Sequence, residues 1–277
     1  FSTFNAIGTQ GTLPNTQALA LGAFLGVNQR LDEMGAPRDK QRTFIANPAM
    51  NAAAVTGLAG LFNNQSSLGQ QYQRGMIVDS LGLSFAMDQN VDVHTNGTAV
   101  VATNTVNGAG QSGATITVNA LNGTVTRGTR VTFAGVFSVN PQSRQSTGTL
   151  AQFVVTADAA ASATSLAISP ALTPTGPFQN VTASPGNSAV ITILGTASGS
   201  YNCNVAFHRD AFTLATVPLY APVGGKGVVD VAQESYKGIN LRVIEFYDGV
   251  NDNHIMRFDV LFGYAATYPE LACLYIH

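Results

Sequence analysis

Hydrophobic side chains recur at helical spacing near the start of the chain. Either Asn15 or Thr16 can cap a helix that runs to about Met34, and Gly35 with Pro37 would end it. Because residues three or four apart share one face of a helix, the segment predicts an amphipathic helix. Its apolar stripe consists of Ala20, Phe24, Val27, Leu31 and Met34.

A short strand and a second helix are predicted next. Residues 43–46 (TFIA) suit a strand, and Asn47 can cap a helix that begins at Pro48, where a missing N–H costs nothing. A weaker helical segment over 67–74 and an extended segment over 77–93 follow. The stripe of the second helix is Met50, Ala54, Leu58 and Leu61, and in the extended segment Leu81, Leu83 and Phe85 alternate with Ser80, Gly82 and Ser84.

The middle of the chain has the alternating pattern of short strands. Turn signals rich in Gly, Pro and Asn separate four such segments, 115–120, 130–136, 152–156 and 189–194, and the Pro-rich stretch 170–177 is expected to be an ordered loop. Short strands with frequent turns predict a barrel or sandwich. Its expected core is Ile116, Val118, Val131, Phe133, Val136, Phe153, Val155, Ile191 and Ile193.

Two longer strands are predicted towards the end of the chain, at 239–246 and 255–262, with a turn over 247–253 between them. In the second strand four apolar residues face one way and two charged residues face the other. The apolar residues are Met256, Phe258, Val260 and Phe262, and the charged ones are Arg257 and Asp259.

Composition divides the chain into three parts. There are 13 Lys and Arg and 15 Asp and Glu residues, 10% of 277, against about 25% in an ordinary soluble domain. Residues 95–200 hold 4 of these charges and 19 of the 28 Thr, whereas the flanks hold 24 charges in 171 residues. We therefore expect an all-β domain at 95–200, inserted between the two parts, 1–94 and 201–277, of an α+β domain.

No catalytic, cofactor or metal site is expected. The cluster of His208, Arg209 and Asp210 lacks a nearby nucleophile, and adjacent residues of a regular element point apart. The acidic segment 247–253 lacks the closing Glu of a calcium loop, so it is interpreted as a hairpin turn. Segment 220–227 fails the spacing of a phosphate-binding loop. The histidines, at 94, 208, 254 and 277, are scattered, and Asp158 is the one acid of the middle region.

Charge and hydropathy exclude further classes. A net charge of −2 offers no basic field for nucleic acid. The most apolar segment, 49–62, is shorter than the roughly 20 residues of a membrane-spanning helix. Cys203 and Cys273 are expected to be reduced, buried and inert. Because Phe1 is not an initiator Met and no signal-peptide pattern follows it, we expect a fragment or a processed chain.

Four segments resemble the major capsid (coat) proteins of tailed bacteriophages, in particular podovirus-type coat proteins with an inserted β-domain. They are RTFIANPAMNAA (42–53), the inserted-domain segment RGTRVTFAGVFSVNPQSRQSTGTLAQFVVTAD (127–158), NVAFHRDAFTLATVPL (204–219) and the closing segment 236–277. The resemblance implies the Hong-Kong-97-type capsid fold, with a peripheral domain, which would include 42–53, and an axial domain, which would include the closing strands.

The resemblance also implies a function and partners. The expected protein assembles with copies of itself, as hexamers and pentamers, into the icosahedral shell of a phage or prophage, and is made in the cytoplasm of a bacterial host. Scaffolding and portal proteins are expected partners, DNA would touch the inner surface non-specifically, and no membrane is involved. The family's N-terminal arm, extended loop and long helix would precede Phe1, so we expect the 277 residues alone to associate weakly.

Two other classes remain open at this stage. A secreted or surface-displayed binding module of the adhesin kind would explain the Thr-rich β region, but it fits poorly with the helical first flank. An enzyme would need convergent polar groups, and the sequence offers none.

Overall fold

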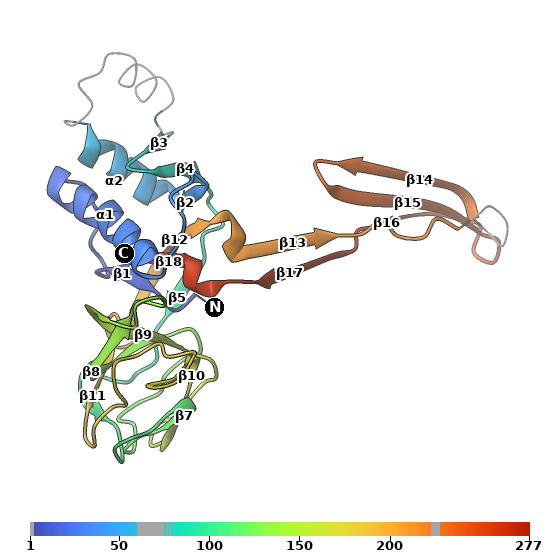
Figure 1. The fold of residues 1–277 in the computed structure, drawn as a ribbon. Helices are drawn as coiled ribbons and strands as arrows, with labels where there is room; N and C mark the ends of the chain where they lie inside the picture. The colour runs from blue at the N-terminus through green and yellow to red at the C-terminus, as the bar shows by residue number, and fades with distance from the viewer. Residues whose placement is uncertain (1–2, 60–74, 76, 78, 223–227) are drawn as a thin grey trace. The chain divides into compact units, whose positions relative to one another are not determined.

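A computed structural model describes residues 3–59, 75, 77, 79–222 and 228–277 (Figure 1). The chain forms two compact units. Unit 1 comprises Phe1–Ala211 and Tyr268–His277, and unit 2 comprises Phe212–Thr267. The expected third part, 201–277, is therefore divided: its two ends belong to unit 1, and the stretch between them forms unit 2.

A seven-stranded mixed sheet lies in unit 1. Its order is β1-β18-β12-β2-β4-β3, with β5 also paired to β12. The pairs β1/β18 and β2/β4 are parallel, and the others are antiparallel. The strands are β1 (Ala6–Gly8), β2 (Arg42–Ala46), β3 (Asp79–Ser80), β4 (Leu83–Met87), β5 (Val93–Thr95), β12 (Ser200–His208) and β18 (Ala272–Ile276).

The two predicted helices are confirmed, with their caps. In α1 (Gln17–Glu33) the Thr16 hydroxyl accepts from the Leu19 N–H at 3.4 Å, and in α2 (Pro48–Leu58) the Asn47 side chain accepts from the Met50 N–H at 2.8 Å. Their apolar faces pack on the mixed sheet in a cluster of buried side chains that includes Phe24, Phe44 and Phe85. The predicted helical segment 67–74 lies outside the described residues.

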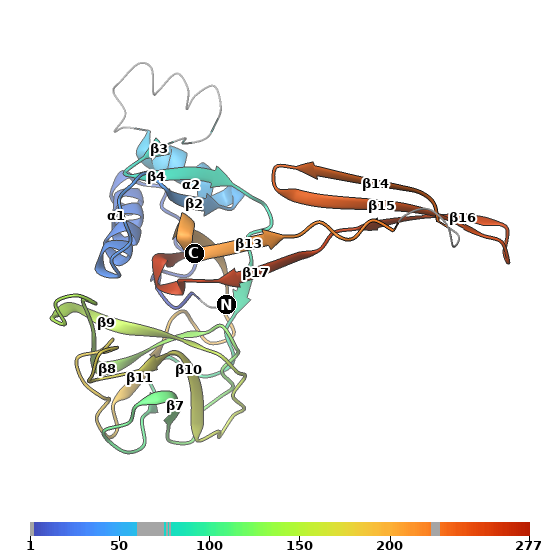
Figure 2. The same cartoon turned by 45° about the vertical axis from the view of Figure 1, so that its right-hand side comes forward.

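A six-stranded sheet is the second sheet of unit 1, with the strand order β6-β11-β8-β9-β10-β7. Figure 2 labels its strands β7 to β11. The nine core residues predicted from alternation are all buried in its hydrophobic cluster, where the Phe133 and Phe153 ring centroids lie 5.5 Å apart. The strands are β6 (Asn104–Thr105), β7 (Gly113–Thr117), β8 (Arg130–Val139), β9 (Ser146–Val155), β10 (Ser165–Leu172) and β11 (Val190–Ile193).

The loop expected at 170–177 is wrong at its beginning, because Pro170 lies inside β10. This strand pairs with β7 through Ala167 and again through Leu172, with a shift of register between them. Proline has no N–H to give to a ladder, so within sheets it is tolerated at edges and irregularities of this kind. A proline-based expectation of a loop therefore missed the strand.

Unit 2 consists of β-strands. A two-stranded sheet pairs β13 (Phe212–Thr216) with β17 (Phe262–Ala266), and a three-stranded antiparallel sheet has the order β14-β15-β16. The turn predicted at 247–253 is confirmed between β15 (Ile239–Asp248) and β16 (Asn253–Asp259). The single strand predicted at 255–262 is wrong: β16 ends at Asp259, and β17 pairs with a different partner. β14 spans Val228–Tyr236.

The two cysteines are free thiols on adjacent strands, and the expectation that both are buried is correct for Cys273 alone. Cys203 is partly exposed. Cys203 lies opposite Ile276 and Cys273 opposite Ala206, so three ladder positions, roughly 10 Å, separate them. That separation exceeds the reach of a disulfide. Burial raises the pKa of Cys273 to about 12, which leaves it a thiol at neutral pH.

The cluster of the six-stranded sheet makes a test of stability possible. Phe133 is fully buried, so Phe133→Ala is expected to lower the free energy of unfolding by about 3–5 kcal/mol. Phe137, on the same strand, is partly exposed, and Phe137→Ala is expected to cost about 1 kcal/mol or less. Urea unfolding of both variants measures the difference. Equal losses of unfolding free energy in the two variants would show that Phe133 is not part of a stabilising core.

Candidate functional site

The polar cluster around His208 links the end of β12 to the segment that follows α1. The His208 ring is almost fully buried at the end of β12. Its Nε2 lies 3.1 Å from Asp39 Oδ1, and its Nδ1 accepts from the Asp210 N–H at 3.3 Å. Nδ1 is thus an acceptor, so Nε2 carries the proton and donates it to the carboxylate. No hydroxyl or thiol contacts the ring among the described residues, so the cluster lacks a nucleophile for the histidine to activate.

The sequence missed the main partner in this cluster, because Asp39 is 169 residues away. It also expected Asp210 to point away from His208, yet the two side chains lie 3.5 Å apart, because a short 3-10 turn over Arg209–Ala211 bends the chain back. Desolvation raises the pKa of the Asp39 carboxyl, but hydrogen bonds from His208 and the Gln41 N–H outweigh it, and the net pKa is lowered. The pair holds the segment after α1 against β12.

The remaining histidines do not converge. His94 and His277 are buried in unit 1, and His254 forms an exposed pair with Glu245 at 3.0 Å in unit 2. Burial, together with the positive charge of Arg130, lowers the pKa of His94, and burial lowers that of His277. Within the described part of the chain, no three His, Cys, Asp or Glu side chains lie close enough to hold a metal ion.

The carboxylates of the 247–253 turn are used within the turn itself. In the turn of 247–253, Asp248 accepts from the Val250 N–H at 3.0 Å and from the Asn251 amide at 2.7 Å, while Asp252 accepts from the Tyr247 hydroxyl at 2.6 Å. These carboxylates stabilise their own turn. Residues 223–227 of the glycine-rich segment lie outside the described residues.

The feature that stands out is an uncovered apolar surface on the three-stranded sheet of unit 2. Cross-strand pairing places Tyr236 opposite Ile239 and Phe258 opposite Val243 on one face. Tyr236 is 70% exposed and Phe258 64%. Alternation along β15 and β16 adds two more exposed side chains. We call this surface the exposed sheet face, and its residues are Tyr236, Ile239, Leu241, Met256 and Phe258.

The opposite face of the same sheet is more polar. Arg242 and Arg257 both bind the Asp259 carboxylate, at 3.1 Å and 2.6 Å. Among the described residues of unit 2, Ile244 is the one buried side chain. A small sheet is stable when its apolar face packs against another element. We therefore expect a partner surface to cover the exposed sheet face.

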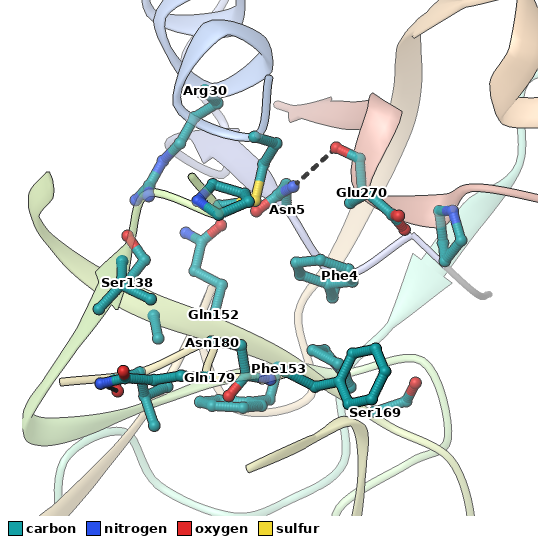
Figure 3. A pocket seen from close by; sticks show the side chains of 18 of the residues that line it. Phe4, Asn5, Arg30, Ser138, Gln152, Phe153, Ser169, Gln179, Asn180 and Glu270 are labelled. Atoms are coloured by element: carbon teal, nitrogen blue, oxygen red, sulfur yellow. Dashed lines mark hydrogen bonds between the residues drawn. The ribbon is translucent and has the colours of Figure 1, made fainter. Parts of the chain in front are cut away.

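A second feature is a cavity of about 470 Å³ in unit 1 (Figure 3). Phe4 and Pro269 line it from one side, and Phe153 and Pro170 from the six-stranded sheet. The amide of Gln152 beside it both donates to and accepts from the Ala6 backbone, at 2.7 Å each. The polar groups of Asn180 likewise bind Thr173 and Ala171. Since these wall groups are already paired, the cavity favours an apolar occupant.

Comparison with known sequences decides between the open classes. The family described as "P22 coat protein - gene protein 5" matches residues 6–275. The chain belongs to the P22 coat protein family. It is a structural major capsid protein of a tailed phage, which confirms the resemblance and disfavours the adhesin. Membership in this coat protein family implies self-assembly into a shell and location in the virion.

Among solved structures, the "CUS-3 coat protein I-domain" is similar to part of this coat protein. The identity is 32%, over 33% of this chain and 94% of that chain, and the TM-score is 0.26. No curated protein sequence matches the chain. Among the described residues, none of the helices has the length and apolar character needed to span a membrane.

The buried histidines predict loss of stability in acid. Because the folded coat protein holds His94 and His277 below the ordinary pKa of 6.5, the unfolded chain binds protons more readily. Their contribution is therefore complete above pH 6.5 and lost as the pH falls through the lowered values. Urea midpoints at pH 7.5 and pH 5.5 measure this.

The control is a largely exposed histidine. We expect His94→Gln to reduce the difference in midpoint between the two pH values. His254→Gln, at an exposed ring paired with Glu245, is the matched control and should change that difference less. A pH dependence that is the same in both variants and in the unaltered protein would assign the acid sensitivity to other groups.

Proposed function

We propose that this coat protein has the Hong-Kong-97-type capsid fold, with an axial and a peripheral domain, and that it forms hexamers and pentamers in an icosahedral shell. The observation that carries the proposal is the exposed sheet face, because a sheet with one buried side chain among its described residues needs partners to cover it. Interfaces of obligate assemblies are large and apolar, which matches this surface.

We also propose that residues 95–200 are a separately folding, barrel-like β-domain inserted into the capsid fold. Two observations support it. The six-stranded sheet has its own hydrophobic cluster, all of whose members lie between Ala99 and Ile193. The ends of the segment also meet, since Thr95 pairs with Ser200 across β5 and β12 and their hydroxyls lie 2.7 Å apart. An insertion whose ends are adjacent interrupts its host least.

The proposed partners follow from the same role. Scaffolding and portal proteins would guide assembly in the host cytoplasm, and packaged DNA would meet the inner wall without sequence readout, as the net charge of −2 suggests. No catalytic activity is proposed, because the hydrogen bonds of His208 join two segments of the fold.

Particle formation tests the assembly proposal. The product of the complete gene is expected to form closed particles visible by negative-stain electron microscopy, whereas residues 1–277 alone are expected to associate weakly. Phe258→Asp places a charge on the exposed sheet face and is expected to reduce the particle yield at least tenfold, since a buried unpaired charge is strongly unfavourable. Ser235→Asp, exposed on the opposite face, is the matched control and should assemble normally. Particles from both variants in equal yield would exclude this face from assembly.

Excision tests the domain proposal. An isolated 95–200 segment is expected to unfold cooperatively with a heat capacity change of ~1.3–1.6 kcal/mol/K, the value for 106 residues. Calorimetry and circular dichroism measure it. A random-coil spectrum without protected amides would show that these strands need the rest of unit 1.

A further inference from the structure

Phe178 is one of the residues that line the cavity of unit 1. Its side chain is 88% exposed, although it lines the rim of an apolar space large enough to hold it. A dry cavity of about 150 Å³ already accepts a benzene ring, and this one is about three times larger. A single exposed aromatic residue needs no explanation by itself. An exposed ring at the edge of an apolar cavity does.

The loop that carries Phe178 is held in place. The Arg144 guanidinium donates to the carbonyl of Pro177 at 2.6 Å and also to that of Gly176. Asn180 closes the other end, because its N–H donates to the Thr173 carbonyl at 3.0 Å and its side-chain oxygen accepts from the Thr173 N–H at 2.8 Å. The exposed position of Phe178 is therefore fixed by the loop and is already organised for contact.

We propose that Phe178 of one copy enters the cavity of a second copy, and that the second copy returns its own Phe178 to the first. The donor ring and the acceptor cavity belong to the same patch, which is the property of an isologous, two-fold contact. Such a contact involves two copies and no more, and it would join neighbouring copies within the shell. It rests on the proposed assembly function and names a surface of unit 1 that the exposed sheet face does not include.

Charge and chemistry favour a second copy as the occupant. The two ionised side chains that line the cavity, Arg30 and Glu270, have opposite signs, so two facing copies avoid a purely like-charged rim. The wall amides are paired internally, so an apolar side chain suits the space better than a polar ligand does. Burying two Phe rings in two apolar pockets would give the contact the central aromatic anchors that dominate interface energies.

Cross-linking between two populations tests the proposal. Copies with Phe178→Cys are co-assembled with copies with Met34→Cys, a cavity-lining residue, and treated with a short bis-maleimide. A covalent dimer of twice the mass of one copy is expected in this mixture. The unaltered protein controls for the native thiols, and Val250→Cys, at a residue 92% exposed on unit 2, replaces Phe178→Cys in the matched control mixture and should yield no more dimer than the unaltered protein.

The outcomes separate the two proposals. Particles without a dimer above the controls would overturn the Phe178 contact and leave the assembly function standing. If the unaltered product of the complete gene forms no particles, both proposals are overturned. A dye that fills the cavity in free copies yet remains bound after assembly would identify a small apolar ligand as the occupant and would also overturn the contact.

A second measurement covers the energetics. Phe178→Ala is expected to raise the protein concentration needed for assembly by about tenfold or more. Phe137→Ala, a partly exposed phenylalanine outside the cavity, should leave it unchanged. Because Phe178 is exposed in the single chain, its replacement should not alter the urea midpoint of unassembled protein. Unchanged assembly with Phe178→Ala would refute the proposal.

Discussion

The pairing of β12 is the interaction on which the described architecture depends. This strand lies between β18 and β2 in the mixed sheet, and its first residues also pair with β5. It therefore joins the chain's last strand, an early strand and both ends of the 95–200 segment in one ladder. Its last residue, His208, binds Asp39 and precedes the turn at which the chain leaves for unit 2. The nine residues of β12 thus pair with three strands that are remote from one another in sequence, β2, β5 and β18.

The two sheets of unit 1 keep separate hydrophobic clusters, and side-chain hydrogen bonds join them. The Gln152 side chain forms two hydrogen bonds with the backbone of β1. The Thr149 hydroxyl lies 3.0 Å from both Arg30 and Glu33 of α1. Such bonds fix orientation while adding little net stability, about 1 kcal/mol each. These hydrogen bonds therefore orient the six-stranded sheet against the mixed sheet, while its stability comes from its own hydrophobic core.

The sequence was informative where structure is local and less so where it depends on distant pairing. Local patterns predicted the Asn47 cap, the nine core positions and the 247–253 turn, and they narrowed the first cap to Asn15 or Thr16. The partners of β18, the break after Asp259 and the bond from Asp39 to His208 depend on contacts across 17 to 268 residues. Alternation marks a strand but not its partner, so the end of β16 could not be read from a continuous apolar pattern.

The exposed sheet face was partly visible in the sequence, as Met256 and Phe258 facing one way, but its exposure was not. Alternation shows that one face is apolar without showing whether the same chain covers it. Sparse charge supplies the missing inference. Many of the charged groups described here are used inside the chain, among them Arg42 with Asp32 and Arg242 with Asp259. Because only 10% of the residues are charged, we expect the register between copies to depend more on the shape of apolar surfaces than on charge.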